Sequence, residues 1–159
     1  MENICPICVK QPNAHSFMCL CQTISNKYIF YTKFASAKLY NDTEGILKHH
    51  ENLLNFVNPS SWIWIVDCNG FGLKHSLEIK TAFGLLNMIR KNGNIHRILI
   101  INANSFIYNI YKIVKLSFNE DLQKKTVFIK PAEKNIYIDE LNNFKLSDEN
   151  YNMLNNFME

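Results

Sequence analysis

The sequence predicts a single α/β domain with a mixed, mainly parallel sheet, and three observations support this prediction. Residues 62–66, WIWIV, form an unbroken apolar run, which is typical of a strand covered on both faces. A second run of this kind, ILII at 98–101, follows after a helical pattern. A strand, a helix and a strand within about 40 residues form a βαβ unit, so the two strands should pair in parallel.

The size and composition suit one soluble domain that is rich in aromatic side chains. Of the 159 residues, 47% are hydrophobic and 13% aromatic, enough to fill a thick core or line an apolar cavity. We expect residues 1–15 to form an arm with a CxxC motif and residues 16–159 to form the domain. The net charge is +3 with scattered basic residues, which argues against nucleic acid as a partner. Neither a signal peptide nor a run of about 18 apolar residues is present, so we expect a cytoplasmic protein.

Four of the five cysteines lie near the start, as Cys5 and Cys8 and then Cys19 and Cys21. Two thiolate pairs could hold zinc, with His15 as a spare ligand. The second pair has the wrong spacing, because side chains two apart on a strand point the same way. A redox-active dithiol lies where a strand leads into a helix, but only four residues precede Cys5, so the first pair does not follow a strand. We therefore expect buried thiols that pack as small apolar groups and no metal site, with zinc as the alternative.

A hairpin and a helix are predicted before the central strand. Two strand-like runs, SFMCLC and KYIFYTK, flank a turn at Ser25 and Asn26, which predicts a hairpin at the sheet edge. A helix should begin at Asp42, whose carboxylate suits a cap, and end before Pro59. Its core-facing stripe comprises Ile46, Leu47, Leu53, Leu54 and Val57.

A second helix should connect the two buried strands. Ser76 is a suitable cap, and Gly93 is a suitable stop after a cationic last turn. Apolar residues recur at helical spacing at Ile79, Ala82, Phe83, Leu86 and Ile89. Further along, TVFIK at 126–130 predicts another strand. Residues 147–158 predict a final helix, with Tyr151, Leu154 and Met158 on one side.

Residues 105–117, SFIYNIYKIVKLS, predict a helix that is apolar over most of its circumference. Asn109, Lys112 and Lys115 form one narrow polar stripe. An ordinary surface helix carries an apolar arc of roughly a third of its circumference. This helix should therefore be wedged between the sheet and neighbouring helices, or it should face an apolar ligand.

The sequence lacks the residue combinations that catalysis needs. It has no glycine-rich phosphate-binding loop. His49 and His50 are helix neighbours and so diverge, whereas His75 and His96 lie near opposite ends of one βαβ crossover. Asp67, at the end of the central strand, is expected to accept N–H bonds from the turn that follows. We expect no catalytic residue, no cofactor and no enzyme activity, but binding of an apolar ligand.

The order of these segments resembles the Sec14-like, or CRAL-TRIO, lipid-binding domain. The resemblance rests on WIWIVDCNGFG before a helix, on RILIINA before an apolar helix, and on Lys125 before TVFI. It extends from residue 62 to 130 and, more weakly, from residue 16. The chain would be a minimal version, because the N-terminal helical extension and the Leu-Pro…Gly-Gly segment of the family are missing.

The resemblance implies a hydrophobic pocket above the sheet, closed by residues 105–118 as a gate helix. Lys125 matches a lysine that meets the headgroup of phosphatidylinositol, and Gly72 and Lys74 match a site for phosphocholine. The hydroxyl side chains of that second site are absent, and Gly93 replaces the acidic partner of the lysine. The implied pocket and gate residues are Phe106, Ile107, Tyr108, Ile110, Tyr111, Val114, Trp64 and Val66.

Three functions are consistent with this pattern. The first is binding, without catalysis, of a phospholipid such as phosphatidylinositol, or of another lipophile, with transfer through transient contact with membranes. The second is a Sec14-like protein-interaction module whose pocket has collapsed and whose surface binds a protein partner. The third is a regulatory domain of the STAS type, for which Ser76 or Ser105 at a helix start would be the phosphorylated residue.

Overall fold

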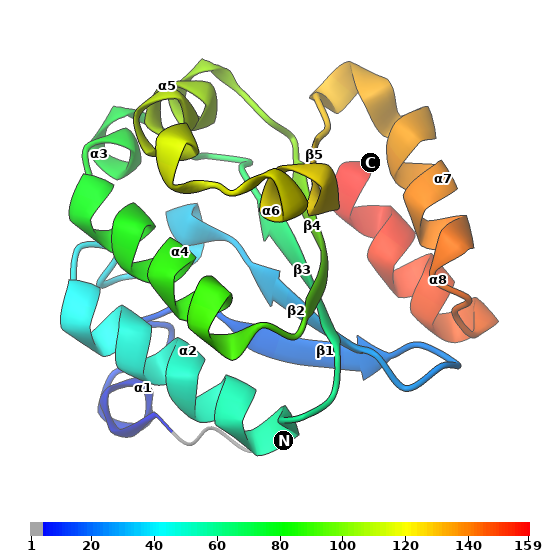
Figure 1. Ribbon diagram of the computed structural model, residues 1–159, viewed down its shortest axis with the longest axis horizontal. Coiled ribbons are helices and arrows are strands. Elements are labelled where there is room, and N and C mark those ends of the chain that lie inside the picture. Colours follow the sequence, from blue (N-terminus) through cyan, green and yellow to red (C-terminus); the bar gives the residue numbers. More distant parts are fainter. Residues whose placement is uncertain (1–4) are drawn as a thin grey trace.

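The computed structural model describes residues 5–159 as a five-stranded sheet with helices on both faces (Figure 1). The strands lie in the order β1-β2-β3-β4-β5, with β1 antiparallel to β2 and the other neighbours parallel. This confirms the predicted mixed, mainly parallel α/β fold with a hairpin at one edge. The strands are β1 (Met18–Gln22), β2 (Tyr28–Thr32), β3 (Trp62–Asp67), β4 (Ile95–Ile101) and β5 (Thr126–Phe128).

The helices divide between the two faces of the sheet (Figure 1). On one side lie α1 (Pro6–Lys10), α2 (Thr43–Val57), α3 (Leu73–Ser76), α4 (Ile79–Asn92), α5 (Ser105–Val114) and α6 (Glu120–Lys125). On the other lie α7 (Lys134–Asn143) and α8 (Asp148–Asn155). Short 3₁₀ turns are η1 (Phe34–Ser36), η2 (Lys115–Ser117), η3 (Pro131–Glu133) and η4 (Asn156–Met158). No helix within residues 5–159 combines the length and apolarity needed to cross a membrane.

The central strand β3 supplies both hydrophobic cores, because its side chains alternate between the two faces. Trp62, Trp64 and Val66 join the core beneath α2, α4 and α5. Ile63 and Ile65 join the core beneath α7 and α8. Every residue of β3 is buried, which confirms the strand covered on both faces.

Several predicted helix ends are confirmed by their capping contacts. The Asp42 carboxylate accepts the Gly45 N–H at the start of α2, at 3.2 Å. Gly93 ends α4 with φ 71°, in the left-handed region that favours glycine. The final helix is confirmed as α8 and η4, with Leu154 and Met158 buried.

The prediction that Ser76 caps the second helix is wrong. The chain forms the short helix α3 first, and the Ser76 hydroxyl donates to the Leu73 carbonyl oxygen at 2.7 Å. The longer helix α4 begins only at Ile79, so Phe83 lies partly exposed and Leu85 takes the buried position. The strand predicted at 126–130 ends at Phe128.

The prediction that Cys19 and Cys21 point to the same side is also wrong. The pairing register of β1 with β2 shifts between these two residues, which marks a bulge or irregularity. Cys19 therefore packs against the core beneath α2 and α4, whereas Cys21 packs against the core beneath α7 and α8. The alternation rule fails here because the strand gains a residue without a partner.

Candidate functional site

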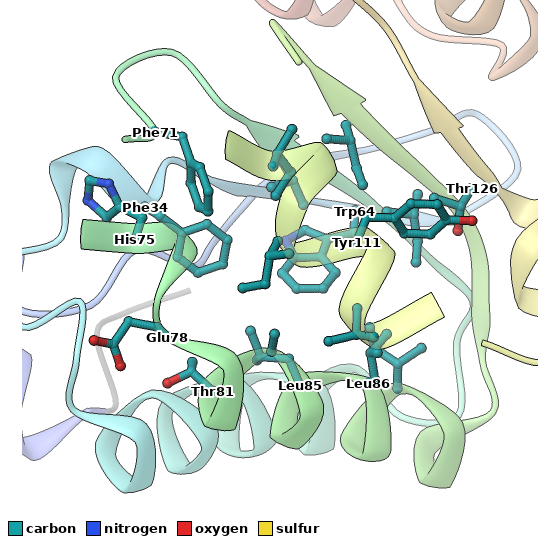
Figure 2. Close-up of a pocket in the computed structure, with 18 of the residues that line it drawn as sticks. Phe34, Trp64, Phe71, His75, Glu78, Thr81, Leu85, Leu86, Tyr111 and Thr126 are labelled. Carbon is teal, nitrogen blue, oxygen red and sulfur yellow. The ribbon is translucent and has the colours of Figure 1, made fainter. Parts of the chain in front are cut away.

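An apolar cavity of about 130 Å³ lies between the sheet, α4 and α5 (Figure 2). The strands β3, β4 and β5 form its floor through Trp64, Val66, Ile98, Ile100 and Phe128. Leu85 and Leu86 reach into it from α4, as Figure 2 shows. The helix α5 and Phe118 close it from above; their lining residues are Ile107, Ile110, Tyr111, Val114 and Phe118.

Asn104 fixes the helix α5 over this cavity. Its side-chain oxygen accepts the N–H groups of Phe106 and Ile107, at 3.1 and 3.2 Å, and so caps the helix. Its side-chain N–H₂ group donates to the carbonyl oxygens of Phe71 at 2.9 Å and Cys68 at 3.4 Å. One residue therefore joins the start of α5 to the turn that follows β3.

His75 is one of the few polar residues in a mainly apolar lining and lies at one end of it (Figure 2). The Gly72 N–H donates to His75 Nδ1 at 3.0 Å, which leaves the proton of the neutral ring on Nε2. Burial, and then the Lys74 ammonium, lower the pKa of His75, so the ring is neutral at neutral pH. The buried Nε2 has no hydrogen-bond partner among residues 5–159. The structure therefore leaves this donor unsatisfied.

Tyr40, Glu78 and Thr81 also lie in the lining, with Glu78 and Thr81 on the side of His75 in Figure 2, whereas Thr126 lies on the opposite side and its hydroxyl donates to the Leu122 carbonyl oxygen at 2.8 Å. The Lys74 ammonium lies 4.8 Å from the centre of the Tyr40 ring, a cation–π contact. The Thr81 hydroxyl is hydrogen-bonded to that of Thr43 at 2.7 Å. This end of the cavity can therefore meet an oxygen-bearing group, whereas the remainder suits hydrocarbon.

Asp67 has the turn-fixing contact predicted for it. Its carboxylate accepts the Asn69 N–H at 2.9 Å, the Asn102 side-chain N–H₂ at 2.9 Å and the Tyr31 hydroxyl at 2.7 Å. Burial, together with the bond to this carboxylate, raises the pKa of Tyr31 and keeps its hydroxyl protonated. The carboxylate thus joins three segments at the carboxyl ends of the strands.

The structure brings six of the eight residues implied as pocket and gate together around the cavity. They are Trp64, Val66, Ile107, Ile110, Tyr111 and Val114. The other two pack beside it: Tyr108 stacks on Phe128 with ring centres 5.1 Å apart, and Phe106 contacts the surrounding core.

The three residues implied for headgroup binding are not brought together. Gly72 and Lys74 adjoin His75 at the carboxyl end of β3. Lys125 immediately precedes β5 at the opposite end of the parallel strands, where its ammonium lies 3.0 Å from Asp121. A single small headgroup therefore cannot contact Lys125 and Lys74 at once.

Sequence reasoning missed part of the lining. Leu85 was missed because a different set of residues on that helix was predicted to be buried, and Phe118 lies within the predicted gate of residues 105–118 but was not named as a lining residue. Phe34 and Tyr40 come from irregular segments, where no periodicity indicates which side chains turn inward. His75 has no sequence signal for a place in the lining, because its separation from His96 along the βαβ crossover only excludes a shared metal site.

A second group of polar side chains lies apart from the cavity. Cys5, Cys8, His15 and His49 are all buried, and their potential ligand atoms lie within 4.8 Å of one another. The sequence suggested the first three as alternative zinc ligands, but His49 was missed. Its proximity depends on how α1 packs against α2, for which local sequence gives no signal.

Comparison with protein-family profiles matches residues 15–149 to the CRAL/TRIO domain. The matched range contains all five strands and every residue that lines the cavity, but not Cys5 or Cys8. A search of curated proteins found no significant match. Domains of this family bind lipophiles and are generally not catalytic. The match and the fold agree, and they exclude the STAS-type interpretation: the chain belongs to the CRAL/TRIO domain family.

Proposed function

We propose that this protein binds one lipid molecule in the cavity beneath α5 and transfers it between membranes without chemical change. The observation that carries the proposal is the apolar, partly open cavity that β3, β4, β5, α4 and α5 line. Each CH₂ group moved from water into such a site contributes about 0.8 kcal/mol, so six buried carbons contribute about 5 kcal/mol. Burial of even part of an acyl chain is then sufficient for useful affinity.

The size of the cavity determines which ligands fit without a movement of the protein. A cavity of about 150 Å³ holds one benzene molecule, and the cavity here measures about 130 Å³. A ring or a short chain segment fits without rearrangement, whereas the two tails of a phospholipid require α5 and Phe118 to move outward. We propose that α5 is the gate and that the position of α5 in this structure, over a small and partly open cavity, is the closed state of the gate.

The polar end of the cavity supports a lipid with an oxygen-bearing group at one end. The unpaired Nε2–H of His75 would donate to a carbonyl, hydroxyl or phosphate oxygen of the ligand. We propose a phospholipid, held with its polar end near His75 and Lys74. Lys125 would contact only a ligand that reached the far end of the strands.

The competing function is a protein-interaction module with a collapsed pocket. The cavity beneath α5 favours lipid binding over this alternative, because a collapsed domain would fill that space with side chains. A protein partner therefore ranks second.

Native mass spectrometry tests the proposal directly. The purified protein would be incubated with liposomes that contain phosphatidylcholine, phosphatidylinositol and a single-chain fatty acid. We expect a one-to-one lipid adduct and movement of the same lipid from donor to acceptor liposomes. A protein that keeps its ligand-free mass and transfers none of these lipids would contradict the proposed function.

A cavity-filling substitution provides the matched test. Ala82 lies on α4 and lines the cavity, so Ala82→Phe should fill part of the space that the lipid needs. We expect at least tenfold less adduct and transfer, because filled volume excludes several buried CH₂ groups at about 0.8 kcal/mol each. The control is Asn87→Phe, which adds the same ring at an exposed position of the same helix. Equal lipid uptake by both variants would show that the lipid does not bind in this cavity.

A further inference from the structure

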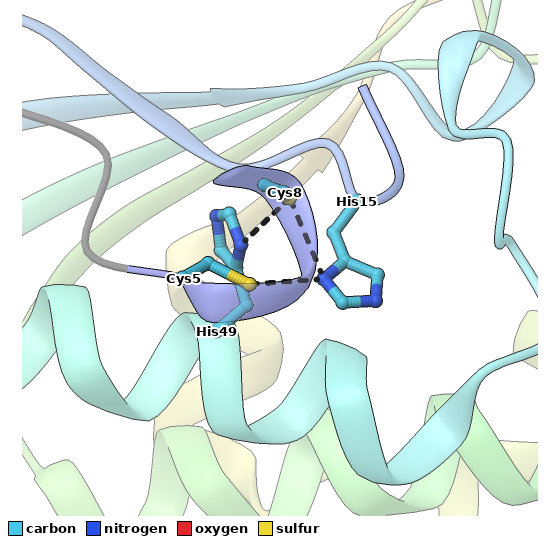
Figure 3. Close-up of side chains that lie close together, drawn as sticks. All are labelled: Cys5, Cys8, His15 and His49. Atoms are coloured by element: carbon cyan, nitrogen blue, oxygen red, sulfur yellow. Dashed lines mark hydrogen bonds between the residues drawn. The ribbon is translucent and has the colours of Figure 1, made fainter. Parts of the chain in front are cut away.

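Four buried side chains from three separate segments meet between the N-terminal arm and the domain (Figure 3). Cys5 precedes α1 and Cys8 lies within it, His15 follows in the next loop, and His49 lies on α2. In Figure 3 both sulfur atoms and one nitrogen of each ring point into the same space. From this arrangement we infer a structural zinc site with two thiolate and two imidazole ligands.

The distances between the potential ligand atoms fit a tetrahedral zinc centre. With Zn–S bonds of about 2.3 Å and Zn–N bonds of about 2.05 Å, tetrahedral angles place each sulfur about 3.6 Å from each nitrogen. His15 Nδ1 lies 3.6 Å from Cys5 Sγ and 3.7 Å from Cys8 Sγ. His49 Nδ1 lies 3.6 Å from Cys8 Sγ. These three distances match a zinc tetrahedron, and all four potential ligand atoms lie within 4.8 Å of one another, so small side-chain shifts would complete the geometry.

Each imidazole is oriented by a second hydrogen bond on its outer nitrogen. His15 Nε2 lies 2.9 Å from the Asp42 carboxylate, and His49 Nε2 lies 2.8 Å from the carbonyl oxygen of Phe17. Both partners accept hydrogen bonds, so each outer nitrogen carries the proton and each Nδ1 lone pair points inward. Carboxylate and carbonyl partners of this kind hold histidines for metal binding.

The backbone of α2 leaves room for these outer partners. A Cβ atom on Gly45 would lie 1.9 Å from the Asp42 carboxylate and 2.9 Å from the His15 ring. The same carboxylate also caps α2, so the start of this helix and the orientation of His15 depend on one another.

The described part of the arm, residues 5–15, contacts the domain through a few apolar groups and through two backbone hydrogen bonds of 2.8 Å from the N–H groups of residues 38 and 39. Its apolar contacts are a small cluster of Cys5, Cys8 and Ala14 with the partly buried Leu39. A metal ion would join the arm to α2 across more than 40 residues of sequence. Its binding would supply stability that would otherwise require more apolar contacts between the arm and the domain. All four ligand positions come from protein, which is typical of a structural zinc site rather than a catalytic one.

The test begins with the unaltered protein. Purified from zinc-supplemented cells, it should contain one zinc ion per chain, and Co²⁺ added to the metal-free protein should give the visible absorption of tetrahedral, thiolate-bound cobalt. Removal of the metal should lower Tm by roughly 5 to 15 °C. None of these measurements depends on lipid, so they remain valid if the proposed function is wrong.

Two single substitutions complete the test. Cys8→Ser should abolish stoichiometric zinc and the cobalt absorption, whereas Cys19→Ser, at the half-buried thiol on β1, should retain both. Two outcomes would overturn the inference. One is protein without bound zinc and without cobalt absorption, in which the four side chains form a hydrogen-bonded cluster only. The other is a Cys5–Cys8 disulfide in protein purified without reductant.

Discussion

Two polar side chains fix the geometry at the carboxyl ends of the strands. Asp67 joins the turn after β3 to Asn102 and Tyr31, and Asn104 joins the same turn to the start of α5. The opposite end of α5 continues into η2 and Phe118, where the described contacts include one exposed hydrogen bond from the Gln123 side chain to the Phe118 carbonyl oxygen and the packing of Tyr111 against Phe118. An outward movement of α5 would therefore pivot near Asn104 and open the cavity at Phe118.

His75 should distinguish ligands by their oxygen atoms. His75→Phe keeps an aromatic ring but removes the Nε2–H donor, and a single hydrogen bond contributes about 0.5 to 1.5 kcal/mol. We expect the affinity for a ten-carbon alcohol to fall about two- to tenfold, as measured by isothermal calorimetry. The affinity for the corresponding alkane should remain unchanged.

The alkane is the internal control for this substitution, because the variant also loses the acceptor of the Gly72 N–H. Any distortion of the turn should affect both ligands equally. An equal loss of affinity for alcohol and alkane would show that His75 acts on the shape of the cavity and not on the ligand oxygen.

At the scale of elements, α5 and η2 present apolar side chains to solvent as well as to the cavity. Leu116 is 91% exposed and Ile113 is 49% exposed, and both lie close to Lys112 and Lys115. Exposed leucine beside lysine is typical of segments that lie in the membrane interface. The proposed gate would thus also be the part of the molecule that meets the membrane.

Leu116→Ser should weaken binding to liposomes. Burial of a leucine side chain contributes about 1.5 to 3 kcal/mol, so we expect partitioning that is weaker by roughly 10- to 150-fold in a sedimentation assay, and slower lipid transfer. The amount of lipid bound at equilibrium should stay the same. Phe56→Ser on α2 is the control, because Phe56 is an exposed apolar residue away from the proposed gate. Equal effects of both substitutions would contradict a membrane contact through η2.

Elements with strong local signals were predictable from the sequence. The apolar runs of β3 and β4 predicted buried strands. The mainly apolar pattern of residues 105–117 predicted the helix that covers the cavity. The helix α7 was missed because its sequence, KNIYIDELNN, has little amphipathic periodicity, and tertiary packing of Tyr137 and Leu141 determines it.

Contacts between distant segments were less predictable than the elements. The bulge in β1 reverses the direction of Cys21, and the packing of α1 on α2 brings His49 to Cys8. Neither follows from residue spacing, because both depend on how separate elements dock. The pocket could be predicted from one helix pattern and a family resemblance, whereas the metal-ligating group required the three-dimensional arrangement.

At the scale of the whole molecule, the sheet separates the helices α2, α4 and α5 from the helices α7 and α8 (Figure 1). The cavity and the proposed metal site both lie on the side of α2, α4 and α5. The other side is a compact core beneath α7 and α8, and none of its residues lines the cavity. Movement of α5 can therefore occur while this second core holds the sheet together.

Tyr137 in this second core should make global stability sensitive to alkali. Its ring is fully buried, and its hydroxyl donates to the Leu154 carbonyl oxygen at 2.7 Å, which joins α7 to α8. Burial raises the pKa of Tyr137, so the folded protein keeps the hydroxyl neutral while the unfolded chain ionises above about pH 10. The stability from this group is complete below pH 10 and is lost as pH rises further.

The substitution Tyr137→Phe separates the hydrogen bond from the titration. At pH 7 the variant should be less stable than the wild type by about 1 kcal/mol, because the bond to Leu154 is lost. Ionisation of the unfolded wild type costs it about 1.4 kcal/mol by pH 11, so the difference should vanish or change sign there. Urea unfolding at both pH values measures this difference in stability. The control is Tyr151→Phe, because Tyr151 packs against the same core beneath α7 and α8. A difference that stayed constant from pH 7 to 11 would show that Tyr137 is not held neutral by the fold.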